Sequence, residues 1–221
     1  MKQRQNIFHF FIFFSLFFSS EKMIAQNKLE VYQVNYRFHL TSTDSVDKEV
    51  TAAIQMLNEA GPAIKVYTNE EKTKMEDHSK SPFVQVTNWA DSTSFKYFTR
   101  FDSLKVKERI SLTVPEYFQE MKISFPEETQ VISGYTCNLA RLSWDKPDAD
   151  MEILIWYVKG LPKIFFSEYE FLLSIPGLPL KVIAKGINEN DFEYGLEVLS
   201  IEKRVVESSF FEVPEEYRII E

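Results

Sequence analysis

Apolar and polar residues alternate through most of this chain, and this period of two constrains its fold more than any other feature. In one stretch, Tyr36 and Phe38 fall on one side while Arg37 and His39 fall on the other. Successive side chains of a strand point to opposite faces, so the pattern predicts half-buried antiparallel strands. Similar strand-like runs cover residues 29–40, 64–66, 83–89, 94–101, 104–114, 130–144, 151–158, 180–184 and 194–206. We expect residues 69–80 to form an exposed hairpin end and residues 116–126 a connection.

One segment has a helical period instead. Val50, Ile54 and Leu57 recur on one stripe of a helix, and Gly61-Pro62 ends it. A single short helix is marginal in water, so its stripe must pack on the sheet. Because strands and helices do not alternate, the predicted fold class is mainly β with some α+β character. We expect a curved antiparallel sheet, or a half-open β-barrel, wrapped around this one helix.

The N-terminal 25 residues have the layout of a secretory signal peptide. Lys2 and Arg4 precede an almost wholly apolar run at residues 7–18, and Ala25 supplies a small residue for cleavage. A retained membrane anchor is the alternative, but a span needs about 20 apolar residues. We therefore expect a signal peptide at residues 1–25 and one exported domain at residues 26–221, with no transmembrane anchor after cleavage.

The charge of the mature chain excludes some partners. The whole chain has a net charge of −8, and the leader carries three cations and one carboxylate, so removing its +2 leaves −10. Nucleic acids and anionic headgroups need clustered Lys and Arg, and no such cluster occurs. Cys137 is the single cysteine, which rules out an intramolecular disulfide. With no cation beside it in sequence, we expect a buried structural thiol instead of a reactive one.

Two short motifs that contain glycine and proline interrupt the strand-like runs of the C-terminal half. Gly160-Leu161-Pro162 is the first, and Pro176-Gly177-Leu178-Pro179 is the second. Proline lacks an N–H donor, so the second motif is not expected in a regular helix or a central strand. We predict a corner there, with Gly177 free to adopt a positive φ.

The C-terminal half resembles a known family. The matching residues are Gly134-Tyr135-x-Cys137-x-x-Ala140, Trp156-Tyr157, Leu161-Pro162, Pro176-Gly177-Leu178-Pro179-Leu180, and Phe211-Glu212-Val213-Pro214 with Tyr217. They resemble the GLPGLI family and its DUF4412-like relatives, small exported proteins of Gram-negative bacteria. The namesake sequence differs, since Pro-Gly-Leu-Pro-Leu replaces Gly-Leu-Pro-Gly-Leu-Ile, which favours the relatives.

The resemblance implies a fold and a location but no reaction. These families have no established activity, and the fold kinship proposed for them is to periplasmic lipoprotein carriers. Such carriers hold acyl chains between a half-open barrel and a helix, although fold alone does not fix function. The resemblance implies a location in the periplasm or outside the cell, with Gly134, Cys137, Pro176, Gly177 and Pro179 as structural motif residues.

Patterns for catalysis are mostly absent. The sequence has no Gly-x-Ser-x-Gly elbow, no phosphate-binding glycine loop and no His-Glu-x-x-His. A metal site would need His39, His78 and Cys137 to converge from separate elements, so we expect neither a metal nor a cofactor. Paired carboxylates lie beside turn signals and are typical of solvated loops. A hydrolase therefore remains a third-ranked alternative, since a Ser–His–Asp triad need not be local in sequence.

The abundant aromatic residues leave two functional hypotheses. They either pack the core or line an apolar cleft; the cleft residues we expect are Tyr36, Phe38, Ile54, Leu57, Trp156, Phe171 and Leu178. A cleft would make the chain a non-enzymatic binding protein for a lipid, an acyl chain or a lipid-modified partner. A filled core would favour a structural or interaction module of the cell envelope, with residues 83–89 as an edge strand that binds a protein partner. In either case we expect a monomer.

Overall fold

The fold is known from a computed structural model, which describes residues 28–42, 52, 55–56, 58–59, 61–78, 82–100, 103–114, 116, 121–144, 151–186 and 192–219. The strands are β1 (Lys28–Ser42), β2 (Ile64–Thr68), β3 (Lys72–Asp77), β4 (Phe83–Asn88), β5 (Thr93–Arg100), β6 (Leu104–Arg109), β7 (Met121–Ser124), β8 (Thr129–Ile132), β9 (Tyr135–Trp144), β10 (Met151–Lys159), β11 (Gly177–Gly186), β12 (Phe192–Glu207) and β13 (Arg218–Ile219). Among the elements whose bounds the structure describes, the 3₁₀ helices η2 (Glu170–Ser174) and η3 (Ser208–Phe211) accompany them.

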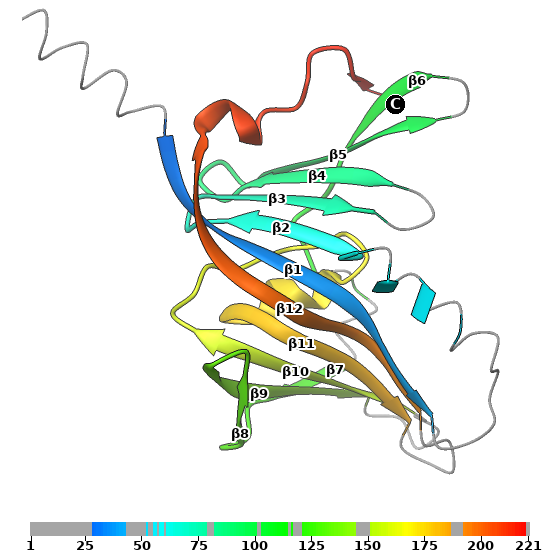
Figure 1. The fold of residues 1–221 in the computed structure, drawn as a ribbon, viewed down its shortest axis with the longest axis vertical. Coiled ribbons are helices and arrows are strands. Elements are labelled where there is room, and N and C mark those ends of the chain that lie inside the picture. Colours follow the sequence, from blue (N-terminus) through cyan, green and yellow to red (C-terminus); the bar gives the residue numbers. More distant parts are fainter. Residues whose placement is uncertain are drawn as a thin grey trace, which may run out of the picture.

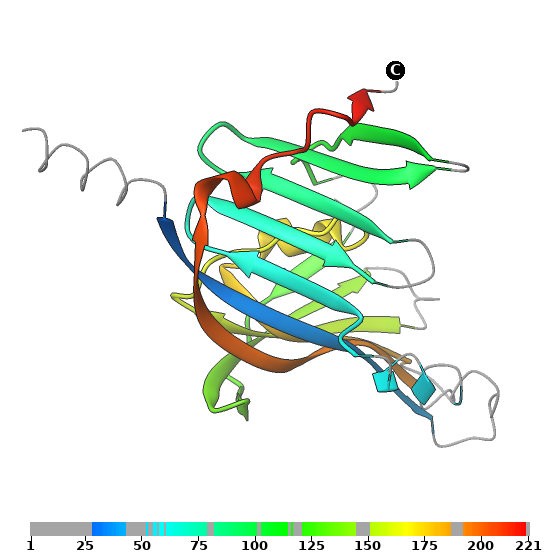
Figure 2. The same ribbon diagram turned by 45° about the horizontal axis from the view of Figure 1, so that its top comes forward.

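All of these strands belong to one open, curved sheet (Figures 1 and 2). Its order is β13-β6-β5-β4-β3-β2-β1-β12-β11-β10-β9-β7, and β8 also pairs with β9. Every pairing is antiparallel except the short contact of β13 with β6. The predicted mainly β class and antiparallel sheet are therefore confirmed, but the sheet does not close on itself.

The two longest strands lie side by side in the middle of the sheet. β1 and β12 pair from Lys28 opposite Glu207 to Ser42 opposite Phe192, with one bulge beside Asn35. The strands β2 to β6 extend the sheet on one side of this pair, and β11 to β7 extend it on the other (Figure 1).

The predicted helix falls mostly outside the described residues. Five described positions between residues 52 and 59 have helical backbone, but Ile54 and Leu57 are not among the residues that the structure describes. The packing of this helix against the sheet therefore stays a prediction. None of the described helices is long and apolar enough to cross a membrane.

A segment without strands crosses one face of the sheet, the face that carries Val34 and Tyr36 and is here called the inner face. This segment, residues 160–176, is here called the strap; it includes η2 and contacts both halves of the sheet (Figure 2). Phe165 and Phe166 are 0% and 1% exposed, and the Phe166 ring meets Tyr36 edge-on with centroids 6.1 Å apart. Of the two possibilities that the sequence left open, a packed core and an apolar cleft, this face is mostly a packed core, filled by the chain itself.

Buried polar side chains fix the strap to the sheet. Thr68 and Thr73 on β2 and β3 donate hydrogen bonds to the Lys163 carbonyl oxygen at 3.2 and 3.4 Å. On β4, the Gln85 side-chain oxygen accepts one from the Ser167 N–H at 3.0 Å. Buried polar groups are costly without partners, so these contacts explain why polar residues occupy inward positions here.

The opposite face is covered by the end of the chain. Val31, Val86, Tyr97 and Phe211 form a second buried cluster there. The Tyr97 ring packs edge-on against Tyr217, with centroids 4.8 Å apart. Residues of the C-terminal tail therefore pack on this face.

The structure corrects the predicted corner at Pro176-Gly177-Leu178-Pro179. Gly177 to Pro179 begin β11, a central strand, and Gly177 has no positive φ. Proline is tolerated because a bulge lies between Pro179 and Lys181, and pairing with β12 starts only at Lys181. Glycine is required for another reason: a Cβ on Gly177 would lie 2.2 Å from the Val158 carbonyl oxygen.

Three other expectations about local structure are wrong. Residues 116–126, expected to be a connection, contain β7. The polar stretch at residues 69–80 contains β3, in which Thr73 and Met75 are each 1% exposed. Residues 83–88 form β4 between β3 and β5, so this strand is not an edge available to a partner. The described edges of the sheet are β13 at one end, and β7 with β8 at the other.

Gly134 and Cys137 have structural roles. Ser133 and Gly134 both have positive φ in the tight turn that joins β8 to β9, where glycine is favoured. Cys137 is fully buried and unpaired, and burial raises the pKa of its thiol. This agrees with the expected structural cysteine.

Candidate functional site

An apolar pocket of about 300 Å³ remains between the strap and the strands β10, β11 and β12. It is here called the strap pocket and is lined by Met151, Ile153, Glu168, Tyr169, Phe171, Val182, Ala184, Tyr194 and Gly195. Cross-strand pairing places Ile153 and Tyr194 on either side of Ala184. Ala184 and Gly195 have small or no side chains, which leaves space below the strap.

The polar groups of the strap pocket come mainly from the strap. Glu168 forms an ion pair with Lys96 of β5, with Nζ and Oε1 2.6 Å apart. Burial raises the pKa of Tyr169 to about 12, and Tyr194, Glu168 and Asp77 add to that rise. The Tyr194 hydroxyl lies 3.7 Å from the sulfur of Met151, and both residues line the pocket.

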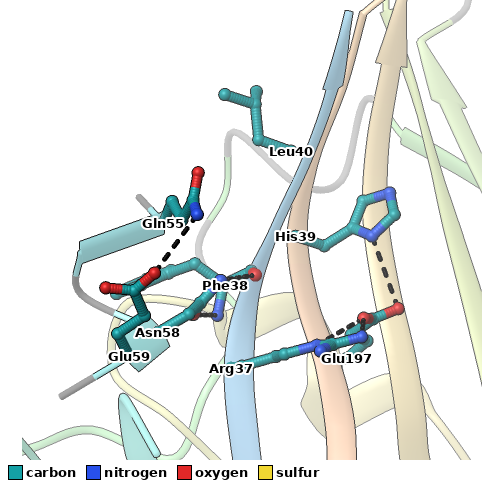
Figure 3. Close-up of a pocket in the computed structure, with 8 residues that line it drawn as sticks. All are labelled: Arg37, Phe38, His39, Leu40, Gln55, Asn58, Glu59 and Glu197. Atoms are coloured by element: carbon teal, nitrogen blue, oxygen red, sulfur yellow. Dashed lines mark hydrogen bonds and ion pairs between the residues drawn. The ribbon is translucent and has the colours of Figure 1, made fainter. Parts of the chain in front are cut away.

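A second, larger pocket of about 570 Å³ lies beside β1 and is here called the edge pocket (Figure 3). Its lining residues are Arg37, Phe38, His39, Leu40, Gln55, Asn58, Glu59 and Glu197. Gln55, Asn58 and Glu59 lie on one side of β1, whereas Arg37, His39 and Glu197 lie on the other (Figure 3). It forms where β1 continues past its pairing with β2, which ends at Tyr36 opposite Ile64.

Polar groups of the edge pocket mostly satisfy one another. The Asn58 amide bonds both the N–H and the carbonyl oxygen of Phe38, at 3.1 and 2.9 Å, and so imitates a neighbouring strand. Arg37 donates to Glu197 at 2.6 Å, and Gln55 donates to Glu59 at 3.2 Å. A ligand would have to displace these bonds, whereas the strap pocket offers mostly apolar walls.

His39 lies between two carboxylates on the outer side of β1. Its Nδ1 is 3.4 Å from Glu197 and its Nε2 is 3.5 Å from Glu193. The imidazole points to the face opposite Tyr36, as predicted, but its side chain is only 14% exposed. The Nε2 of His78 lies 3.8 Å from Oε2 of Glu76. Within the described ranges, no three His, Cys, Asp or Glu residues are grouped to hold a metal ion.

The structure separates most of the residues predicted to form one cleft. Phe171 lines the strap pocket and Phe38 lines the edge pocket. Tyr36 and Leu178 are buried in the core, where the Tyr36 hydroxyl donates a 2.6 Å hydrogen bond to the Pro179 carbonyl oxygen. Trp156 is half-buried on the face of β10 opposite Ile155. The remaining two, Ile54 and Leu57, lie outside the described residues.

Sequence reasoning missed eight of the nine residues that line the strap pocket. The period-two pattern did place Val182 and Ala184 on one face of their strand. The sequence signal for a cavity was Ala184, a small residue on a strand face whose other residues are bulky and apolar. The contribution of Glu168 and Tyr169 depends on how the strap crosses the sheet, and no local pattern encodes that path.

Comparisons with known proteins identify no family. No protein-family model matches the chain, and no curated protein sequence matches it. The predicted resemblance to the GLPGLI and DUF4412-like families therefore stays a prediction.

Solved structures share the fold over most of the chain. PNGF-II, solved in space groups C2 and P21, matches with TM-scores of 0.50 and 0.51 at 17% and 16% identity. The matches cover 86% and 87% of this chain but only 30% and 31% of PNGF-II, so this chain spans about a third of that protein. A LolA-superfamily protein from Nitrosomonas europaea aligns over 83% of this chain and 90% of its own, with a TM-score of 0.33 and 10% identity. The PNGF-II matches concern the fold and carry no activity to this chain.

Proposed function

We propose that this chain is a non-enzymatic exported protein of the cell envelope that binds a hydrophobic ligand in the strap pocket. The observation that carries the proposal is a largely apolar cavity of about 300 Å³ between the sheet and the strap. Ligand pockets are commonly about 300–1,000 Å³, with apolar walls and a few polar groups. At the small end of this range, the strap pocket suits one short acyl chain or ring instead of a whole diacyl lipid.

Export is the second part of the proposal. It is supported by the N-terminal sequence, in which two cations precede an apolar run and a small residue. The location we propose is the periplasm or the exterior of a Gram-negative cell, in keeping with the family resemblance of the C-terminal half. The lipoprotein-carrier likeness of the fold is part of the same proposal.

Chain length tests the pocket directly. We expect hexanol, heptanol and octanol to bind with affinities that rise about three- to fourfold per methylene, because each buried CH₂ contributes about 0.8 kcal/mol.

Ala184→Phe fills the cavity and is expected to lower octanol affinity at least about tenfold, as titration calorimetry would measure. The matched control is Lys185→Phe, which adds the same ring on the opposite face of β11. Equal binding by both variants, or no dependence on chain length, would contradict the proposal.

The filled inner face supports a second candidate, an interaction module that binds a protein partner at a sheet edge. The edge formed by β7 and β8 carries exposed apolar side chains, with Ile123, Phe125 and Val131 exposed by 36%, 51% and 68%. Exposed apolar groups at an unpaired edge are typical of contact surfaces. A photo-reactive residue in place of Val131 should then cross-link one specific envelope protein in cells. The same residue in place of Leu104, exposed by 54% on β6, should not.

A further inference from the structure

The charge in the lining of the strap pocket is negative. Among the described residues, its lining contains one charged side chain, the Glu168 carboxylate, and no Lys, Arg or His. A fatty-acid carboxylate placed in this pocket would therefore meet a charge of its own sign. A cation would instead meet a charge of the opposite sign, on a side chain that is 41% exposed and paired with Lys96.

Aromatic rings form part of the same walls. Tyr169 and Phe171 come from the strap, with centroids 5.8 Å apart and planes at 82°, so they form two sides of a corner. Tyr194 lines the pocket from β12. Rings with this arrangement can receive a cation, because the face of an aromatic ring carries negative potential.

The Glu168 carboxylate is held in place by the sheet and the strap. One oxygen pairs with Lys96 at 2.6 Å, and the other accepts a 2.9 Å hydrogen bond from the Ser167 hydroxyl. Lys96 is itself positioned over the Phe83 ring, 3.7 Å from its centroid. Because Glu168 lines the pocket and Lys96 does not, the carboxylate is the nearer charge to a bound ligand.

We propose that the ligand of the strap pocket is a small cationic amphiphile, a short apolar chain or ring that ends in an ammonium group. This inference rests on the proposed hydrophobic-ligand function and specifies the ligand class. The ammonium group would lie against Tyr169, Phe171 and the Glu168 carboxylate. The apolar part would lie along Ile153, Val182 and Ala184 of the sheet.

Three probes with the same chain separate charge from hydrophobicity. Octyltrimethylammonium, octanol and octanoate are titrated below their micelle concentrations into the full chain by calorimetry. We expect the cation to bind about tenfold more tightly than octanol, since cation–π and carboxylate attraction add to the same apolar burial. Octanoate should bind most weakly.

Two variants that break the same ion pair show whether the pocket charge is responsible. Glu168→Gln removes the carboxylate and should reduce the cation's preference over octanol to the part that comes from the aromatic rings. Lys96→Met also breaks the ion pair but keeps an unbranched chain over Phe83, and it leaves the carboxylate free. It should therefore retain or increase the preference for the cation. Equal loss in both variants would show that the pair only supports the strap and would overturn the proposal.

The outcomes distinguish this inference from the proposed function. If octanol and the cation bind equally to the wild-type protein, and Ala184→Phe abolishes both, the pocket is hydrophobic but not selective for cations. That result overturns the inference and keeps the proposed function. If none of the three probes binds, both are overturned.

Discussion

Gly177→Ala is expected to lower the free energy of unfolding by about 3 kcal/mol, because the backbone of the neighbouring strand leaves no space for a Cβ at this position. It would lie 2.2 Å from the Val158 carbonyl oxygen and 2.9 Å from its carbon. Both are backbone atoms of the neighbouring strand β10, so relief requires the strands to separate and not merely a side chain to rotate. Urea unfolding of Gly177→Ala, followed by circular dichroism, measures the loss.

Gly160→Ala is the control that separates contact from conformation. Gly160 has φ of +90°, but nothing lies within 4 Å of its Cβ position, so alanine should cost only about 1 kcal/mol. If Gly177 were instead required for a positive φ, as the sequence suggested, the two variants would lose similar stability. A difference of about 2 kcal/mol between them would confirm the close approach of β11 to β10.

Truncation of Phe166 should be similarly severe. Phe166 is 1% exposed and packs edge-on against both Tyr36 of β1 and Tyr169 of the strap, with centroids 6.1 Å from each. Phe166→Ala is expected to cost about 3–5 kcal/mol, since it removes a large ring and leaves a cavity. Chemical denaturation measures the cost, and hydrogen exchange should show faster exchange in the strap than in β1 and β12.

Phe125→Ala provides the matched comparison on the surface. Phe125 is 51% exposed and contacts Tyr157 at a centroid distance of 6.2 Å, so its loss should cost about 1 kcal/mol or less. Equal costs for the two substitutions would mean that the strap contributes little to the core.

Most strands could be predicted because alternation directly reflects one wet and one dry face. The run that became β1 shows this, since Val34 and Tyr36 are buried while Arg37 is exposed. β3 was missed because its inward positions include Thr73, a polar residue. The inner face there meets the Lys163 carbonyl oxygen of the strap, so a hydroxyl group is the suitable inward side chain.

The candidate site was less predictable because it depends on tertiary placement. Its walls come from three strands and the strap, and only Phe171 was among the residues expected. Leu178 and Tyr36 are as apolar as the cleft hypothesis requires, but the strap covers their face of the sheet and buries them. The local sequence shows which side chains avoid water, not which of them leave a space unfilled.

The pairing of β1 with β12 affects how the chain reaches this structure. Asn35 and Ser200, whose side chains are joined by a 2.8 Å hydrogen bond, are 165 positions apart in sequence. Closing so long a loop is entropically costly and slows folding. Until the two strands meet, β1 is an unpaired edge beside β2 and β12 is an unpaired edge beside β11, and such edges favour association with other chains. Newly synthesised chains are therefore most vulnerable to aggregation before β1 pairs with β12. A chaperone that holds unfolded chains would protect them at this stage.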